Sequence, residues 1–375
     1  MKVVDEAVVR AGDGSLSGTS LVAVGERLLC AFRVGSARTS RDGRVVVASS
    51  GDGGRTWDGG RTWDGAEPPW GVTDERIQVT GAQMGASADG TVVLAASGMR
   101  MTEPGDADHE PAASGIADAA GLMLRGSVDG WETPAPLDGR RHDDEWAIPC
   151  GPPLALGGGR WYAPMERHAK AYVPEWLRGY HAFAAVSDDD GRTWLPYTPM
   201  MNDPARRVAH YDQHVAALAD GRIVSLAWAH DVVDDVTLPA RVGWSADGGA
   251  TWSAPRETTL VGGPVAPLTL PDGRLFAAYP RRSAPTGIRA SLSEDGGRTW
   301  GDELVIWDES VRRVTGARPD DAVPGDREPP LWDTMWSWTF GLACPAVLAD
   351  GAVGVAFYAA EPDGTATVRY VRVTV

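Results

Sequence analysis

Three titratable residues of different chemistry stand together in the stretch HYDQHVAAL: Tyr211, Asp212 and His214. A carboxylate, an imidazole and a phenol can each move a proton to or from a reacting group. The apolar residues that follow predict a strand, in which successive side chains point to opposite faces. Strict alternation would place Asp212 with His214 and Tyr211 with Gln213, and we expect one of these pairs to face a site.

Two other segments combine carboxylates with rings and guanidinium groups. RRHDDEW contains Glu145 and Trp146, and MERH contains Glu166. Carboxylates supply acid and base groups, aromatic rings pack against sugar rings, and arginines pair with carboxylates. The predicted catalytic residues are therefore Asp212, His214, Tyr211, Glu166 and Glu145. The predicted substrate-binding residues are Arg33, Arg167, His168, Arg207, Arg281 with Arg282 as its alternative, Trp146, and Trp336 with its neighbours Trp332 and Trp338.

The sequence predicts no metal and no other cofactor. His210 and His214 stand four positions apart, which brings two imidazoles together on a helix but not on a strand. The three cysteines Cys30, Cys150 and Cys344 lie far apart in apolar runs without a CxxC spacing, so we expect buried free thiols.

Composition and charge narrow the range of partners. A formal net charge of −16 argues against nucleic acid, because a phosphate backbone requires a basic surface. The start MKVVDEAVVRAG lacks the pattern of a signal peptide, and no apolar stretch approaches the length of a membrane span. We expect a cytoplasmic protein with a small carbohydrate substrate, and the oligomeric state stays open.

The elements that must position these residues are predicted to be short strands. The chain contains 46 glycines and 27 prolines, which separate short runs of Val, Leu, Ala and Trp. Six of these runs have the form strand, tight glycine turn, strand, as expected for β-hairpins. They are LVAVGERLLCAF, GASADGTVVLAAS, LALGGGRWYAPM, AALADGRIVSLAW, LTLPDGRLFAAY and AVLADGAVGVAFY.

A second repeat, Ser-x-Asp-x-Gly-x-Thr-Trp, follows four of these hairpins. Its copies begin at Ser50, Ser187, Ser245 and Ser293, and a degenerate copy begins at Ser127. This motif resembles the Asp-box, or BNR repeat, of the sialidase-like β-propellers. In the stretch SGDGGRTWDGGRTWDG the hexapeptide GGRTWD occurs twice, and we expect the second copy to lengthen the adjoining loop.

The resemblance implies an all-β fold: a six-bladed β-propeller with four-stranded blades and Asp-box turns. Residues 1–375 would form one such domain, with a strand over 2–10 completing the last blade. The Asp-boxes would lie at the periphery, on the rim shared with the hairpin turns. The variable loops of the opposite rim hold all seven histidines and would form the working face.

The catalytic set of sialidases is not matched in this chain. The resemblance implies an arginine triad for the substrate carboxylate, a Tyr nucleophile activated by Glu, and an Asp acid/base. The segment SLSGTSLVAV has no arginine where the first member of the triad is expected, and Arg33 is the nearest substitute. Tyr358, in the last blade, falls in a second strand and does not match the nucleophile.

Three functions remain open from the sequence. The first is a sialidase-like glycoside hydrolase for a small, acidic glycoside. The second is an oligosaccharide lyase, in which His214 and Tyr211 would remove the proton next to a uronate carboxylate. The third is a non-catalytic propeller that binds a carbohydrate or a protein, because a fold does not fix a function.

Overall fold

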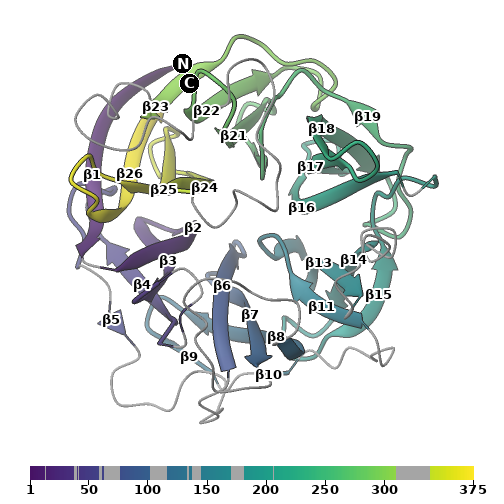
Figure 1. Ribbon diagram of the computed structural model, residues 1–375, viewed down its shortest axis with the longest axis horizontal. Coiled ribbons are helices and arrows are strands. Elements are labelled where there is room, and N and C mark those ends of the chain that lie inside the picture. Colours follow the sequence, from purple (N-terminus) through teal and green to yellow (C-terminus); the bar gives the residue numbers. More distant parts are fainter. Residues whose placement is uncertain are drawn as a thin grey trace.

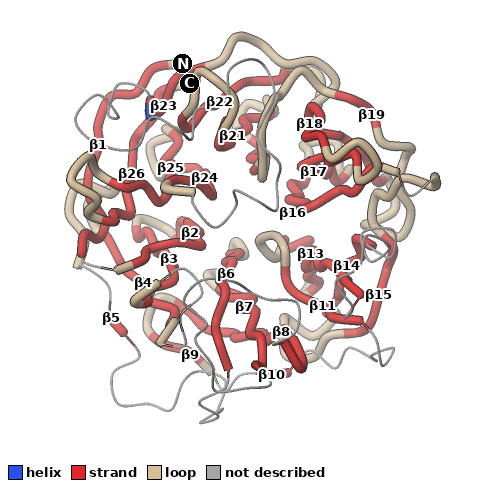
Figure 2. Tube along the Cα trace, viewed as in Figure 1, coloured by secondary structure: helices blue, strands red, loops and turns tan. Residues whose placement is uncertain are grey.

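The protein is a ring of six β-sheets around a central channel (Figure 1), which confirms the predicted six-bladed β-propeller. The computed structural model describes residues 1–12, 14–37, 40, 42–58, 61–62, 77–101, 116–132, 135–136, 145–169, 181–205, 207–309 and 338–375. Strands and turns make up nearly all of this part of the chain (Figure 2).

Each blade is an antiparallel sheet whose first strand lies nearest the channel. Blade one contains β2 (Ser15–Val24), β3 (Arg27–Gly35), β4 (Arg44–Ser50) and β5 (Arg61–Thr62). Blade two contains β6 (Ile77–Ala86), β7 (Val92–Met101), β8 (Ile116–Ser127), β9 (Gly130–Trp131) and β10 (Ala135–Pro136). Blade three contains β11 (Glu145–Pro149), β12 (Leu154–Gly157), β13 (Arg160–Ala169), β14 (His181–Ser187) and β15 (Leu195–Pro199).

The second half of the chain repeats this order. Blade four contains β16 (Val208–Ala217), β17 (Ile223–Asp231), β18 (Val236–Ser245) and β19 (Arg256–Glu257). Blade five contains β20 (Ala266–Thr269), β21 (Leu275–Arg281), β22 (Gly287–Ser293) and β23 (Leu304–Asp308). Blade six contains β24 (Phe340–Val347), β25 (Val353–Ala360) and β26 (Ala366–Thr374), with β1 (Lys2–Gly12) as its outermost strand.

The two ends of the chain meet in blade six. Strand β1 runs antiparallel to β26, from the pair Lys2 and Thr374 to the pair Gly12 and Ala366. Figure 1 shows both termini side by side at the rim of the ring. The first strand of the chain therefore completes its last sheet.

The hydrophobic core is divided among the six interfaces between neighbouring blades. One cluster joins blades six and one, where Leu21 and Phe32 pack with Ala356 and Tyr370. Further clusters join blades one and two, two and three, three and four, four and five, and five and six. Every blade therefore buries both of its faces, and each one depends on two neighbours.

The Asp-box turns are closed networks of hydrogen bonds. In the copy after β14, Ser187 Oγ donates to Asp189 Oδ1 at 2.8 Å and accepts from the Gly191 N–H at 2.9 Å. The Thr193 backbone and hydroxyl both donate to the same carboxylate, at 2.8 and 2.7 Å. These bonds lower the pKa of Asp189 to about 2, with the Thr193 side chain as the main cause. The boxes at Asp52, Asp247 and Asp295 repeat the Ser–Asp and Thr–Asp bonds.

Each of the four boxes also packs against the blade that precedes its own. The Gly249 turn of blade four lies on the ring of Tyr162 in β13, so closely that a Cβ at Gly249 would stand 2.2 Å from a ring carbon. Trp252 Nε1 donates to the Tyr162 hydroxyl at 3.2 Å. The box of blade one uses Tyr370 in β26 in the same way, and the rings of Trp57 and Tyr370 meet edge to face at 5.5 Å.

The duplicated hexapeptide forms part of a strand instead of only lengthening a loop. Arg61 and Thr62 of the second copy pair with Val47 and Val46 as strand β5. Asp58, the last residue of the first copy, accepts hydrogen bonds from the backbone and hydroxyl of Ser49 at 2.9 and 2.8 Å. The second copy therefore supplies the outermost strand of blade one.

Gly249 and Gly248 offer a matched test of the contact between box and blade. Both have a positive φ, of 91° and 70°, but a Cβ at Gly248 would enter open space. We expect Gly249→Ala to lower the free energy of unfolding more than Gly248→Ala, by roughly 1–3 kcal/mol, because it also displaces Tyr162. Urea denaturation of the two variants measures the difference, and equal losses would contradict the contact.

Candidate functional site

The inner strands of blades one, four and six carry a β-bulge that contains a residue with positive φ. The register shifts between Ser17 and Ser20 in β2, between Tyr211 and His214 in β16, and between Gly341 and Cys344 in β24. Each bulge contains a residue with positive φ, namely Gly18 at 65°, Asp212 at 46° and Leu342 at 43°. A residue other than glycine is uncommon in this conformation, and bulges often stand beside active sites.

A bulge interrupts the alternation predicted for β16. Between the pairs Tyr211 with Trp228 and His214 with Leu226, two residues of β16 stand opposite one residue of β17. Tyr211 packs edge to face on Trp228, with ring centroids 6.2 Å apart. Gln213 is fully buried, where its side chain donates to the Met201 carbonyl at 2.6 Å and accepts from Ser225 at 2.9 Å.

His214 instead lines the central channel. Tyr211 belongs to an aromatic cluster with Trp228 and Trp338. The lyase hypothesis, in which Tyr211 and His214 act on one substrate atom, stays a prediction.

The bulge brings the backbone of Asp212 against a carboxylate of the neighbouring blade. Glu166 of β13 is buried, and its Oε1 accepts the backbone N–H of the half-buried Asp212. Cys150 lies near both residues. Burial raises the pKa of its thiol, and the charges of Glu166 and Asp212 raise it further. Two of the predicted catalytic residues therefore meet at the interface between blades three and four.

Two histidines of β16 are held neutral by burial. Burial lowers the pKa of His210 to about 4, helped by the charge of Arg241 and opposed by Asp203. Burial alone lowers the pKa of His214 to about 4, and the backbone of Cys150 opposes it. His230 is also buried, and its pKa is lowered by burial in spite of Asp235, which lies 3.0 Å from its Nε2.

Several predicted site residues are placed by their backbone or lie outside the described residues. In blade three, Glu145 pairs with Ala169 and Trp146 pairs with His168, so these candidates share one end of the sheet. Arg167 lies between Glu166 and His168 in β13. Trp332 and Trp336 lie outside the described residues.

Three of the predicted arginines bind groups of the protein itself. Arg33 is fully buried and donates to the carbonyls of Ala37 and Ser40, each at 2.8 Å, so it holds the turn after β3. Arg207 bridges two aspartates, with its Nε 2.7 Å from Asp231. Arg281 lies 3.0 Å from a Glu303 carboxylate oxygen. We therefore leave these three out of the proposed substrate contacts.

Arg282 occupies a different environment from its neighbour Arg281. Its guanidinium carbon lies 3.6 Å from the ring centroid of Trp338 and 5.5 Å from that of Trp228, and one nitrogen donates to the Gly263 carbonyl. These contacts join three blades. The sequence marks Trp228 only as part of a strand, because nothing local indicates a partner 110 positions away.

Tyr358, which the sequence does not match to a nucleophile, packs on the bulge of blade six. It is paired with Gly341, and its hydroxyl fills the space where a Cβ at that glycine would lie, at 2.6 Å. Its ring is buried. The side chain therefore supports the bulge that contains Leu342.

The described part of the chain lacks both a cluster that could hold a metal ion and a helix that could cross a membrane. None of the groups of His, Cys, Asp and Glu in this part of the chain has three members placed to hold a metal ion. In the same residues, no helix is long and apolar enough to span a membrane. The three cysteines are buried and free.

Comparison with known proteins identifies the repeat. The family model described as "BNR repeat-like domain" matches residues 127–355. None of the curated proteins matches the sequence.

Solved structures with the same fold include one of unknown function and two enzymes. A protein of unknown function from Dyadobacter fermentans is 19% identical with a TM-score of 0.74, over 100% of this chain and 99% of that one. The Hadza microbial sialidase Hz136 is 16% identical with a TM-score of 0.66, over 96% of this chain and 66% of the sialidase. The intramolecular trans-sialidase from Ruminococcus gnavus, in complex with oseltamivir carboxylate, is 12% identical with a TM-score of 0.61, over 97% and 95% of the two chains.

The buried imidazole of His214 should make stability depend on pH. Its pKa is lowered to about 4 in the folded chain, whereas an unfolded histidine titrates near 6.5. The unfolded state therefore binds more protons, and the contribution of His214 is fully present above pH 6.5 and is lost as pH falls toward 4. We expect His214→Phe to reduce the fall in unfolding free energy over this range. Urea denaturation at pH 7, 5.5 and 4.5 measures the unfolding free energy of both proteins. An equal fall in the parent chain and in His214→Phe would contradict the prediction.

Proposed function

This chain belongs to the BNR repeat-like family, and from that premise we propose that it is a sialidase-like glycoside hydrolase for a small, acidic glycoside. The matched region covers residues 127–355, which include both Glu166 and Asp212. Relatives of the same fold include enzymes named as sialidases. The proposal places the reaction at the end of the channel opposite the hairpin turns.

The meeting of Asp212 and Glu166 is the observation that supports this proposal most directly. Glycoside hydrolases commonly use a carboxyl group to protonate the leaving oxygen of the glycosidic bond. Asp212 is partly exposed, whereas Glu166 is 5% exposed. We therefore assign proton transfer at the glycosidic oxygen to Asp212.

Glu166 acts in this proposal as a positioning residue. Its carboxylate accepts the Asp212 N–H, which fixes the backbone of the bulge in its left-handed conformation. A catalytic group held in one geometry loses less freedom when the reaction occurs, so positioning raises the rate.

Two facts support an acidic sugar as the substrate. The Ruminococcus gnavus enzyme was solved with oseltamivir carboxylate, a ligand that carries a carboxylate. The working face predicted from the sequence also contains arginines that can pair with such a group, and Arg167 follows Glu166 directly in β13.

A panel of chromogenic sialosides, uronides and neutral glycosides tests the substrate class. We expect phenolate release from one of the acidic glycosides and none from its neutral counterpart. A rise in absorbance near 235 nm without phenolate release would instead indicate elimination and favour a lyase. Binding of a sugar without turnover of any compound in the panel would favour a carbohydrate-binding propeller.

Three variants test the division of roles between the two carboxyl groups. Asp212→Asn removes the proton donor and should lower kcat by roughly 10²–10⁴-fold. Glu166→Gln keeps an oxygen that can accept the Asp212 N–H. We therefore expect it to lower kcat much less than Glu166→Leu does. Phenolate release under saturating substrate gives the comparison. Equal losses for Gln and Leu would show that the charge of Glu166, and not its hydrogen bond, is what matters.

A further inference from the structure

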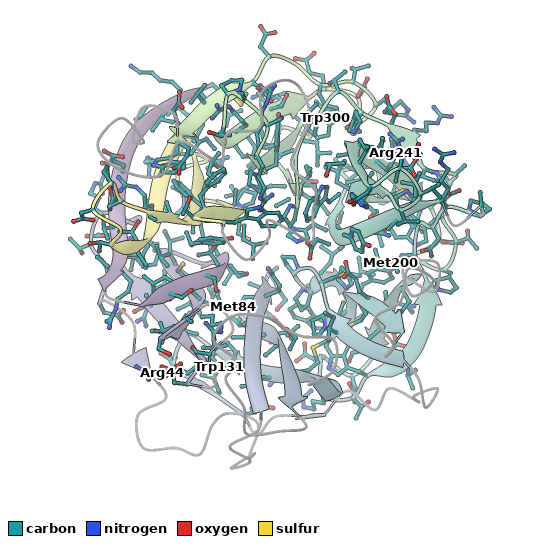
Figure 3. All side chains as sticks on the ribbon, in the orientation of Figure 1. Arg44, Met84, Trp131, Met200, Arg241 and Trp300 are labelled. Atoms are coloured by element: carbon teal, nitrogen blue, oxygen red, sulfur yellow. The ribbon has the colours of Figure 1, made fainter. Side chains whose placement is uncertain are left out.

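The channel contains a cavity at the end opposite the proposed reaction. Its volume is about 380 Å³, and its lining comes from the inner strands of all six blades. The lining segments are the parts of these strands that lead into the hairpin turns, such as 215–217 in β16 and 266–269 in β20. Met84 of β6 belongs to this lining, and Figure 3 places it nearer the centre of the ring than Arg44 or Trp131.

The wall of the cavity is apolar and carries no ionisable side chain that is charged at neutral pH. Alanine, valine, leucine, proline and methionine provide most of it, and the polar side chains are those of His214, Thr269 and Cys344. The Cys344 thiol is held protonated, because burial raises its pKa to about 12. A charged ligand would therefore lose its hydration without gaining an ionic partner.

The same wall offers hydrogen-bonding groups without charge. Strands β2, β6, β16, β20 and β24 each stand at the end of their sheet. An edge strand has one row of backbone N–H and C=O groups that its own sheet does not pair. Because these edges surround the channel, they give an otherwise apolar cavity uncharged donors and acceptors.

His214 adds a buried polar group with unused bonding capacity. The residue is 2% exposed, and among the described residues neither of its ring nitrogens has a partner at full hydrogen-bond geometry, although the backbone of Cys150 lies near enough to raise its pKa. A neutral imidazole has one donor and one acceptor, and a hydroxyl group can satisfy either of them. Buried polar groups usually have a partner, so a ring with unused bonding capacity in a cavity wall is suited to bind a hydroxyl group of a ligand.

We propose that this cavity is a second binding site, for a compact uncharged molecule with an apolar body and one hydroxyl group. Its volume lies near the lower end of the roughly 300–1,000 Å³ found for small-molecule sites. The site is distinct from the face that carries Asp212 and Glu166, and it does not depend on the proposed hydrolysis.

Three fluorinated probes of similar size test the proposal on the full chain at pH 7. They are 4-fluorophenol, which has the hydroxyl, fluorobenzene, which lacks it, and 4-fluorobenzoate, which is charged. Fluorine NMR measures their binding through line broadening. We expect 4-fluorophenol to bind saturably and at least about tenfold more tightly than 4-fluorobenzoate, because the wall has no cation for the carboxylate.

Two variants locate the binding, and a third serves as their control. Ala217 is an exposed residue of the lining, and Ala217→Phe places a ring in the cavity. We expect it to weaken the binding of 4-fluorophenol by about tenfold or more. His214→Phe removes the ring nitrogens and should weaken the binding of 4-fluorophenol by roughly threefold to tenfold. The affinity for fluorobenzene should stay within about twofold of its value in the parent chain. Val233→Phe adds a ring at an exposed position outside the cavity and should change the affinity for neither probe.

Three outcomes would overturn the proposal. They are no saturable binding of 4-fluorophenol at millimolar concentration, unchanged binding in Ala217→Phe, and equal affinity for 4-fluorobenzoate. A thermal melt of each variant establishes that it is folded before it is compared. Asp212→Asn leaves the cavity wall intact and should bind 4-fluorophenol as the parent chain does, which separates this site from the proposed reaction.

Discussion

The pairing of β1 with β26 is the constraint on which the other features of this propeller depend. It brings the first and last strands of the chain into one sheet and so closes the ring. Val9 of β1 belongs to the cluster between blades six and one, and Glu6 lies 3.3 Å from Arg369. An open ring would expose one apolar face on each side of the gap, because every blade is covered by two neighbours. Closure therefore fixes the angles at which the inner strands surround the channel.

The Asp-boxes maintain this arrangement from the periphery, away from the proposed reaction. Each box satisfies its own polar groups within a few residues, so it needs no partner from the channel. Its glycine then packs against the blade before it, as Gly249 does on Tyr162. This separation leaves the inner strands free to carry bulges. A residue such as Asp212 with positive φ costs on the order of 1–3 kcal/mol, and a rigid frame around it can sustain that cost.

The fold could be predicted from the sequence because its signals are local and repeated. Each hairpin turn and each Asp-box lies within about a dozen consecutive residues, and six hairpins with four boxes leave few architectures to choose from. Asp-box geometry needs nothing from the rest of the chain. The same reasoning predicted that Glu166 and Asp212 belong to the working face, since both follow from their places in the repeat.

The surroundings of the site could not be predicted in the same way. The bulge in β16 adds a residue that no alternation pattern reveals, and it places the Asp212 N–H against the carboxylate of Glu166. The arginines present a second case. Arg33, Arg207 and Arg281 are each bound by carbonyl or carboxylate groups, and the partner of Arg281 stands 22 positions away in Glu303. Such partners depend on how loops cross between strands, which single-sequence patterns do not specify.

Conformation alone does not account for the aspartate in the bulge of blade four. The equivalent bulges contain Gly18 and Leu342, so the fold accepts glycine and even a branched side chain at this position. Aspartate does adopt positive φ more readily than leucine, but asparagine does so equally well and carries no charge. Here the carboxylate of Glu166 already approaches the same backbone. An aspartate at this position therefore adds an acidic side chain that the conformation of the bulge does not require.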